Sequence, residues 1–556
     1  MPTPQPPAPP ADPPAPPAPA VGGVLRSSGS LSIGVAVSRV LGLVRQSLFS
    51  RLIGAGALAD AYTVAFRIPN LLRDLLAEGA LSSAFVPTFT AALVQEDQQR
   101  AYRLADLALA GLLLVTGGLT LLGVVFAEQV VRLITSGWSD AKIADTAALT
   151  RIMMPLLALV SVGAVWTGML TAQRRYLPLA YAPAMFNVVS IVAGLGLWLA
   201  GVGGRAAITA WAIATLVAGV AQTVILLPSL WPLGYRPRLR IAGLWTHPGV
   251  RRIVALMLPA VVGVAAVQLN VFVNTRFAAS LGDGPVAQIE YAFRIFFLPI
   301  GIFGVALATV TTTQVSEEAA RGDRRNLIAR TGDGIAAVWL LTSASTVGLC
   351  VLAEPVVALI YEGGKFSHAE TLAVAAILQM YALGLVPYTL VKIVAPAFYT
   401  IDRTRLPLIA SLAAIAVNIG FNALTYRELG APGLALGTSL GAVVNIGLLR
   451  LLYRREIGRL ERPGRARELA WLALANAALA GLLFGLWHLS TRALTWLSGQ
   501  QLPRFALTLV ELALLTLLIA IGFAAYTAVL RRGGFPGADA LARLPIGLVR
   551  RLRRRK

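Results

Sequence analysis

Long apolar runs alternate with short polar loops along almost the whole chain. Since a helix needs about 20 mostly apolar residues to span a membrane, we count about fourteen candidate spans. The pattern therefore predicts an all-α polytopic membrane protein. The second run is long and carries Pro69 and Pro87, which predicts a bent or broken helix. The runs cover approximately residues 28–52, 60–93, 104–127, 147–171, 178–201, 206–230, 252–278, 285–314, 331–355, 370–400, 406–425, 431–452, 467–489 and 505–530.

The composition agrees with this class. Of the 556 residues, 57% are hydrophobic and 13% are charged, whereas a soluble domain has about 25% charged residues. The chain length is typical of a transporter. The single cysteine, Cys350, excludes an intramolecular disulfide, and the three histidines lack metal-ligand spacing.

Basic residues divide the loops into two classes. The loops after even-numbered runs are rich in arginine, and the loops after odd-numbered runs carry few basic residues. Because cytoplasmic loops carry the excess of Lys and Arg, both termini are predicted to be cytoplasmic. Topology thus explains most of the formal net charge of +22. The basic loops lack interleaved aromatic residues, so we expect no nucleic-acid partner.

The two ends of the chain differ from the apolar body. Residues 1–22 are rich in Pro and Ala and have neither the basic nor the apolar region of a signal peptide. We therefore predict a disordered, Pro-rich cytoplasmic tail over residues 1–27. Residues 531–556 are predicted to form a basic cytoplasmic tail.

The sequence Ala-Phe-Arg-Ile occurs at residues 65–68 and again at 292–295. Both copies lie near the start of the second span of a six-span block, so the two blocks have the same orientation. The pattern predicts two six-helix lobes related by a parallel pseudo-two-fold axis along the membrane normal, with a substrate site between them. The expected lobes are 28–231 and 232–454, followed by two C-terminal helices within 455–530.

The clearest functional signal is charge inside the predicted spans. A charge at the bilayer centre costs about 2.5–3.5 kcal/mol on insertion scales, so such residues usually face an aqueous cavity. Because cations are in excess here, we predict that the cavity holds an anion. The chain has no hydrolytic motif or paired carboxylate site, which favours a transporter over an enzyme. The charges between residues 38 and 87 are Arg39, Arg45, Arg51, Asp60, Arg67, Arg73, Asp74 and Glu78.

Several of these charges have simpler interpretations. Arg51 is close to the end of the first span, where an arginine side chain can extend to the interface. Asp60 could cap the helix that it begins or form a gate ion pair with an arginine. Glu78, directly before Gly79, could mark a helix break.

Two cavity candidates have carboxylates nearby in sequence. Arg73 and Asp74 could pair with each other. Arg294 could pair with Glu290, one helical turn earlier. We favour a cavity position for Arg294, facing the arginines of the first span.

Several segments resemble the MurJ (MviN) family of lipid II flippases, over a region from about residue 28 to the C-terminus. The resemblance implies the MOP exporter fold, alternating access and a lipid-tail groove formed by the last two spans. It also implies that the substrate, an undecaprenyl-diphosphate disaccharide pentapeptide, moves from the cytoplasmic to the outer leaflet of the bacterial inner membrane. The matching segments are SRVLGLVRQ (38–46), GAGALADAYTVAFRIPNLLRDLLAEGALSSAFVP (54–87), YAFRIFFLPIGIFGVALAT (291–309), YEGGKFS (361–367) and LVKIVAPAFYTIDRTRLP (390–407).

The resemblance also implies roles for particular residues. Asp60 matches the family's acidic gate residue, and we assign Arg51 and Glu78 to the same gate. Two positions depart from the family. Gln46 stands where the family often has an acidic residue, and Phe297 stands where some members have a glutamate. The positions that match the cavity arginines, which would bind the diphosphate, are Arg39, Arg45, Arg73 and Arg294.

A cation site is a further hypothesis. Asn418 and Asn422 share a helix face, and Thr438 lies on the next span. Their oxygen atoms would suit sodium, and some family members resemble this arrangement with Asp at the position of Asn422. Hydrogen bonding between helices is the alternative that we favour.

The remaining expectations concern energy, partners and competing functions. We expect no cofactor, sodium or the membrane potential as the energy source, membrane lipids as partners and a monomeric state. One competing function is another MOP-type transporter, either a polysaccharide-lipid flippase or a drug antiporter. A membrane glycosyltransferase is the enzymatic alternative.

Overall fold

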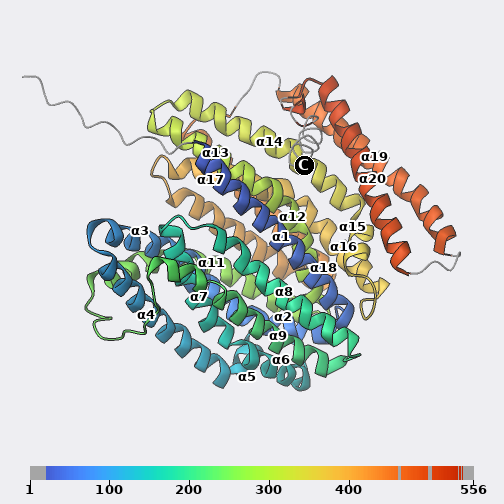
Figure 1. The fold of residues 1–556 in the computed structure, drawn as a ribbon. Helices are drawn as coiled ribbons and strands as arrows, with labels where there is room; N and C mark the ends of the chain where they lie inside the picture. The colour runs from blue at the N-terminus through green and yellow to red at the C-terminus, as the bar shows by residue number, and fades with distance from the viewer. Residues whose placement is uncertain (1–20, 461–464, 499–503, 536, 540, 542–556) are drawn as a thin grey trace, which may run out of the picture.

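The computed structural model describes residues 21–460, 465–498, 504–535, 537–539 and 541 (Figure 1). These residues are helical almost throughout, and their one strand-like pairing is an isolated bridge between Gly363 and Phe366. Twelve of the described helices are long and apolar enough to cross a membrane. The chain is therefore an all-helical, multi-pass membrane protein, as the apolar runs predict. The expected tails covered residues 1–27 and 531–556. Residues 21–27 and 531–532 are helical instead, and residues 1–20 and 542–556 lie outside the described residues.

Two helices bear on the number of spans. The helix α18 (Arg405–Glu456) has 52 residues, far more than a bilayer core of about 30 Å requires. Gly430 divides it into two, because its φ of 59° and ψ of −150° are not helical. The helix α1 (Val21–Ile53) is not among the twelve, and it begins at Val21 instead of near residue 28. Two spans in α18 and one in α1 would give the expected fourteen, which stays a prediction.

The second span of the first half is broken into three pieces. It consists of α2 (Ala57–Arg73), the π-helical turn η1 (Asp74–Glu78) and α3 (Gly79–Gln95). This confirms the expected break and places it after Pro69. The other elements of this half are α4 (Gln98–Val125), α5 (Ala127–Ile134), α6 (Asp140–Met153), α7 (Pro155–Ala172), α8 (Leu177–Leu199), α9 (Gly204–Val224), α10 (Leu227–Leu230) and η2 (Trp231–Leu233).

The second half repeats this order, because a π-helical turn, η3 (Ile300–Gly304), again interrupts its second span. The turn lies between α12 (Pro285–Pro299) and α13 (Val305–Ala320). The other elements are α11 (Pro248–Ala279), α14 (Arg324–Val351), α15 (Ala353–Tyr361), α16 (His368–Leu383), α17 (Leu385–Tyr399) and α18, followed by α19 (Arg465–Ser498) and α20 (Arg504–Arg532).

Equivalent helices of the two halves also begin in the same way. The side chain of Asp97 caps α4, and that of Asp323 caps α14. Ser139 caps α6, and Ser367 caps α16. These shared caps, together with the paired π-helical turns, support the predicted parallel repeat. The lobe boundaries at residues 231 and 454 stay a prediction.

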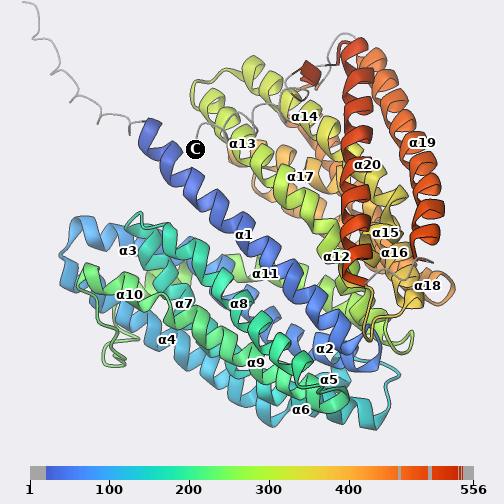
Figure 2. The same ribbon diagram turned by 45° about the vertical axis from the view of Figure 1, so that its right-hand side comes forward.

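The two halves form helical bundles that lie side by side, and the last two helices lie outside them (Figure 2). The helix α11 contacts both α3 of the first half and α18 of the second. The helices α19 and α20 pack against each other and against α14 and α15. This arrangement leaves a space between the halves that helices of both halves line.

Candidate binding cavity and gate

A cavity of about 780 Å³ lies between the two halves. Four arginines and two carboxylates line it, which gives its walls a formal charge of +2. Aromatic rings and amide side chains provide much of the remaining surface. The charged lining residues are Arg45, Arg67, Arg73, Asp74, Glu290 and Arg294.

Three of the four predicted cavity arginines, Arg45, Arg73 and Arg294, line this cavity. Arg39 is not among the lining residues. Its guanidinium group instead lies against Gly301 in η3. The six-residue spacing explains the difference, because it turns Arg39 by roughly 120° from Arg45 around a straight helix.

Arg45 is the least neutralised of the cavity arginines. Its guanidinium carbon lies 5.2 Å from the ring centroid of Phe186. Within the described part of the chain, no carboxylate lies within salt-bridge distance of Arg45. Its charge is therefore free to meet an anionic ligand.

Arg67 and Glu290 form the centre of the cavity, and neither was among the predicted site residues. One Nη of Arg67 donates to Glu290 Oε2 at 3.0 Å, and the other donates to Thr275 Oγ1 at 2.6 Å. Glu290 Oε1 forms a salt bridge with Arg294 Nη2 at 2.9 Å. The predicted pair of Arg294 and Glu290 therefore forms inside the cavity. A signal for Arg67 was present, because Arg67 and Arg294 are the arginines of the two Ala-Phe-Arg-Ile repeats.

Arg73 and Asp74 form the local pair that the sequence predicts. Their charged atoms are 3.0 Å apart, at the junction of α2 and η1. Asp74 Oδ2 also accepts from Gln268 Nε2 of α11 at 3.2 Å. Both charges belong to the first half, so this pair does not join the two halves directly.

Asp60 is fully buried and joins the halves at one end of the cavity. Its carboxylate accepts from Lys142 Nζ at 2.9 Å and from the backbone N–H groups of Gly284 and Ala287 at 2.7 and 2.8 Å. The two roles expected of Asp60, a cap of its own helix and an ion pair with an arginine, both need correction. Asp60 caps α12 of the other half instead of its own helix, and its ionic partner is a lysine instead of an arginine.

Lys142 was not among the predicted site residues. Its Nζ also contacts Asp283 Oδ1 at 2.7 Å and lies 3.8 Å from the ring centroid of Trp138. With Asp60 it links α6 and α2 to the turn before α12. We call the contacts among Asp60, Lys142, Asp283 and the start of α12 the gate network.

Aromatic rings close the same end beside the gate network. Phe49 of α1 contacts Trp211 of α9 and Tyr291 of α12, with centroids 5.2 and 6.5 Å apart. Tyr291 also stacks obliquely on Tyr361 at 4.9 Å and donates from its hydroxyl to the carbonyl of Gly54 at 2.9 Å. The two halves therefore meet here through both apolar and polar contacts.

The other two predicted gate residues, Arg51 and Glu78, lie outside the gate network. The side chain of Arg51 lies against Gly363, and its Nη2 donates to the carbonyl of Leu359 at 3.5 Å. Its backbone carbonyl accepts from Lys365 N at 2.8 Å. Arg51 therefore binds the α15–α16 loop of the other half, and its extension to the membrane interface stays a prediction. The backbone of Glu78 ends η1, and its side chain lies outside the described residues.

The predicted sodium residues form an amide network. Asn274 of α11 donates to Asn418 Oδ1 at 3.0 Å and accepts from Asn422 Nδ2 at 2.7 Å. Asn418 donates to Thr438 Oγ1 at 3.4 Å. The hydrogen bonding between helices that we favoured is therefore present. The sequence pattern missed Asn274, which is distant along the chain. No group of three or more His, Cys, Asp and Glu suited to a metal occurs in the residues that the structure describes.

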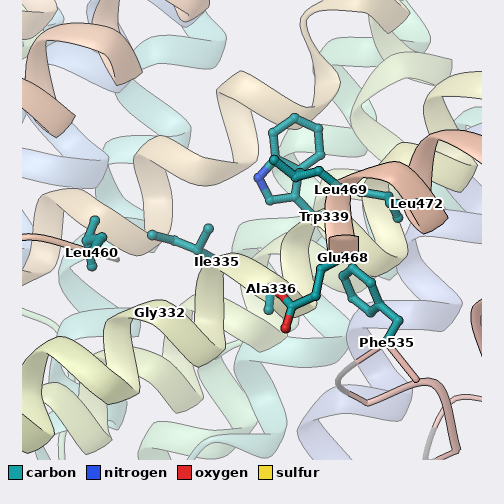
Figure 3. Close-up of a pocket in the computed structure, with 9 residues that line it drawn as sticks. All are labelled: Gly332, Ile335, Ala336, Trp339, Leu460, Glu468, Leu469, Leu472 and Phe535. Atoms are coloured by element: carbon teal, nitrogen blue, oxygen red, sulfur yellow. The ribbon is translucent and has the colours of Figure 1, made fainter. Parts of the chain in front are cut away.

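A second cavity lies between α14 and α19 (Figure 3). Its volume of about 50 Å³ has room for a few water molecules. Glu468, Trp339 and Phe535 are among its lining residues. It is too small for a lipid headgroup, and the lipid-tail groove expected at α19 and α20 stays a prediction.

Comparison with known sequences identifies the family of this chain. A family model described as lipid II flippase MurJ matches residues 49–530. The lipid II flippase MurJ of Burkholderia cenocepacia is 34% identical over 475 residues, covering 85% of this chain and 91% of that protein. The probable lipid II flippase MurJ of Rhizobium meliloti is 33% identical over 519 residues, covering 90% and 95% of the two chains.

Solved structures share the fold. A structure of lipid II flippase MurJ in an inward closed conformation superposes with a TM-score of 0.71 and 23% identity, covering 88% of this chain and 97% of that one. An inward-facing MATE family multidrug transporter of the MOP superfamily gives a TM-score of 0.63 and 18% identity, covering 78% and 98%. The fold is therefore that of the MOP transporters.

Proposed function

Because this chain belongs to the lipid II flippase MurJ family, we propose that it moves lipid II from the cytoplasmic to the outer leaflet of the bacterial inner membrane. The relatives named for this activity support the substrate. Among the residues, the observation that carries the proposal is the cavity of net charge +2 between the halves. A transporter of this kind needs no catalytic residues of its own.

The diphosphate of lipid II fits this charge. It carries two negative charges, and guanidinium groups bind phosphate oxygens through two parallel hydrogen bonds. Arg45 has no carboxylate partner in the described part of the chain and offers such a fork. The cavity volume of about 780 Å³ lies within the range of about 300–1,000 Å³ that is common for ligand sites.

The gate network joins the two halves at one end of the cavity, which supports an alternating-access mechanism. The diphosphate would enter from the cytoplasmic end while Asp60, Lys142 and the start of α12 hold the outer end closed. Release to the outer leaflet then requires those contacts to break. Arg51 and the 362–367 loop would separate in the same step, since they also join the halves at this end.

A depletion experiment tests the function. Cells that lose this protein should accumulate lipid II in the inner leaflet, where an external probe cannot reach it. Lipid II that reaches the outer leaflet at the normal rate would contradict the proposal. Transport of a drug or of another lipid-linked polysaccharide in its place would favour a different MOP transporter. Polymerisation of lipid II by the purified protein would favour the glycosyltransferase.

Thiol labelling tests the proposed orientation, in which both termini are cytoplasmic. In a Cys350→Ser background, Ser136→Cys should react with a membrane-impermeant reagent added to intact cells, because the α5–α6 loop is predicted to be external. Gln99→Cys, on the arginine-rich side, should react only after the membrane is permeabilised. The opposite pattern at both positions would reverse the orientation.

For the energy source, we propose the membrane potential in preference to sodium bound by the amide network. Asn274, Asn418, Asn422 and Thr438 are all uncharged, and most of their polar atoms already bond to one another. Of the side-chain polar atoms of this network, only Asn422 Oδ1 is buried without a hydrogen-bond partner among the described residues. One free oxygen is too few to replace the hydration shell of a cation.

Ion replacement tests this proposal. Exchanging sodium for potassium in proteoliposomes should leave the flipping rate unchanged, whereas collapsing the membrane potential should slow flipping. Loss of activity without sodium, with recovery on its return, would instead assign the ion to the amide network. Asn422→Ala should then remove the sodium dependence.

A further inference from the structure

We propose that Glu290 is an internal competitor of the substrate: in the empty cavity its carboxylate holds Arg67 and Arg294, and the substrate's diphosphate displaces it. This inference rests on the proposed function and adds a role for Glu290, which the sequence names only as a local partner of Arg294. It also explains how a strongly cationic cavity can release an anion.

The geometry places one carboxylate between two guanidinium groups. Glu290 Oε2 accepts from Arg67 at 3.0 Å, and Oε1 forms a salt bridge with Arg294 at 2.9 Å. Each carboxylate oxygen therefore serves a different arginine. The side chains of Glu290 and Arg67 are 28% and 17% exposed, so both remain accessible from the cavity that they line.

The two arginines come from different halves of the molecule. Arg67 lies on α2 and Arg294 on α12, at equivalent places in the internal repeat. Arg67 is also tied to α11 through Thr275. The carboxylate of Glu290 is therefore a contact between the halves in the interior of the cavity, separate from the gate network at its end.

A carboxylate and a phosphate compete for the same donors. Both present negatively charged oxygens that match the guanidinium fork. A diphosphate that binds Arg45 first would lie close to the other arginines of the cavity, and its two charges would then replace the single charge of Glu290. The displaced carboxylate stays on α12, so it can return to the arginines and favour release.

This competition predicts opposite effects on affinity and on rate. Removing the charge of Glu290 should tighten the binding of a diphosphate and slow its release. A residue with a merely structural role would weaken both when it is replaced. The arginines themselves should behave differently, because replacing them weakens binding.

Asp74 supplies a matched control. It is the other carboxylate of the cavity lining, but its arginine partner is its neighbour in sequence. Asp74→Asn removes the same unit of charge as Glu290→Gln while leaving the Arg67–Glu290–Arg294 contact intact. The comparison therefore separates specific competition from the overall charge of the cavity.

The test uses the full-length protein in nanodiscs, with undecaprenyl diphosphate as the binding probe and lipid II flipping in proteoliposomes as the rate. In Glu290→Gln the diphosphate no longer has to displace a carboxylate from Arg67 and Arg294, so the Kd should fall by about tenfold. Flipping should be slower, because no carboxylate returns to the arginines to favour release. Asp74→Asn should lower the Kd less. Glu290→Asp, which keeps the carboxylate, should stay closer to the wild-type protein than Glu290→Gln.

The outcomes are distinguishable. The competition is overturned if Glu290→Gln has an unchanged or higher Kd, or the same Kd as Asp74→Asn. The proposed function still stands in that case, provided that the wild-type protein binds and flips its lipid. Failure of the wild-type protein to bind any diphosphate lipid overturns both. Tighter binding with faster flipping would also overturn the role of Glu290 in release.

Discussion

Arg45→Ala should abolish flipping while leaving folded protein in the membrane. Arg45 lines the cavity without a carboxylate partner in the described residues. An anionic ligand would therefore offset the free-energy cost of placing this charge within the membrane. Charge-assisted hydrogen bonds contribute roughly 1.5–3 kcal/mol each, so the diphosphate should bind about tenfold more weakly or worse. Complementation of a depleted strain and a lipid II binding assay measure the two effects.

The other arginines extend this prediction. Arg73→Ala and Arg294→Ala should also fail, since both residues line the cavity. Arg45→Lys should fail too, because an ammonium keeps the charge but loses the bidentate fork. Arg39→Ala should have a smaller effect than Arg45→Ala, because Arg39 contacts Gly301 outside the cavity lining.

A surface arginine provides the control. Arg205 has a side chain that is 72% exposed and pairs with Asp145, and exposed pairs contribute about 0–1 kcal/mol. Arg205→Ala should therefore complement fully. Normal transport by the alanine variants at Arg45, Arg73 and Arg294 together would show that these residues are structural and that the anion cavity is wrong.

Asp60→Ala should open the outer end of the protein and stop transport. The change leaves Lys142, whose side chain is 9% exposed, without its buried partner. It also leaves the N–H groups of Gly284 and Ala287 without their acceptor. Removing one partner of a buried ion pair costs about 3–5 kcal/mol when the other charge is left alone. Lys142 keeps its contact with Asp283 at 2.7 Å, so we expect a cost toward the lower end of that range and a large shift toward the open form.

Thiol protection measures this opening. Ala61 is buried one residue after Asp60, so Ala61→Cys in a Cys350→Ser background should react slowly in the otherwise wild-type protein. Adding Asp60→Ala should make it react quickly with an external reagent. Asp60→Asn, which keeps an acceptor but not the charge, should lie between the two. Asp145→Ala, at the exposed pair with Arg205, should not alter the reactivity. Equal protection with and without Asp60 would mean that the gate network does not hold this end closed.

Much of the architecture could be predicted from the sequence because it depends on local composition. The cost of exposing polar backbone to lipid forces the apolar runs into helices, so their lengths and order indicate the class. Charges inside such runs are rare, so Arg45 and Arg294 could be assigned to a cavity before any contact was known, and the family resemblance added Arg73. The same charge rule also pointed to Arg39, which does not line the cavity. The pairing of Arg73 with Asp74, and of Arg294 with Glu290, is equally local.

Contacts between helices that are distant along the chain were decided only by the tertiary structure. Asp60 reaches α12, Lys142 reaches Asp60, Asn274 reaches Asn418 and Asn422, and Arg67 shares Glu290 with Arg294. Apart from Glu290 and Arg294, which are one helical turn apart, the partners are widely separated along the chain. Helical periodicity indicates which face a residue occupies, but not which distant helix will lie opposite.

The physical reason is that the lipid constrains each helix separately. Apolarity alone suffices to place a span in the membrane, and it leaves the rotation and the neighbours of that span open. Those are set by the packing of small residues and polar groups between helices. The sequence by itself thus determined the class, the family, the approximate spans and most of the cavity arginines. The packing of the helices decided that Arg67 meets Glu290 and that Asp60 meets Lys142 and the start of α12.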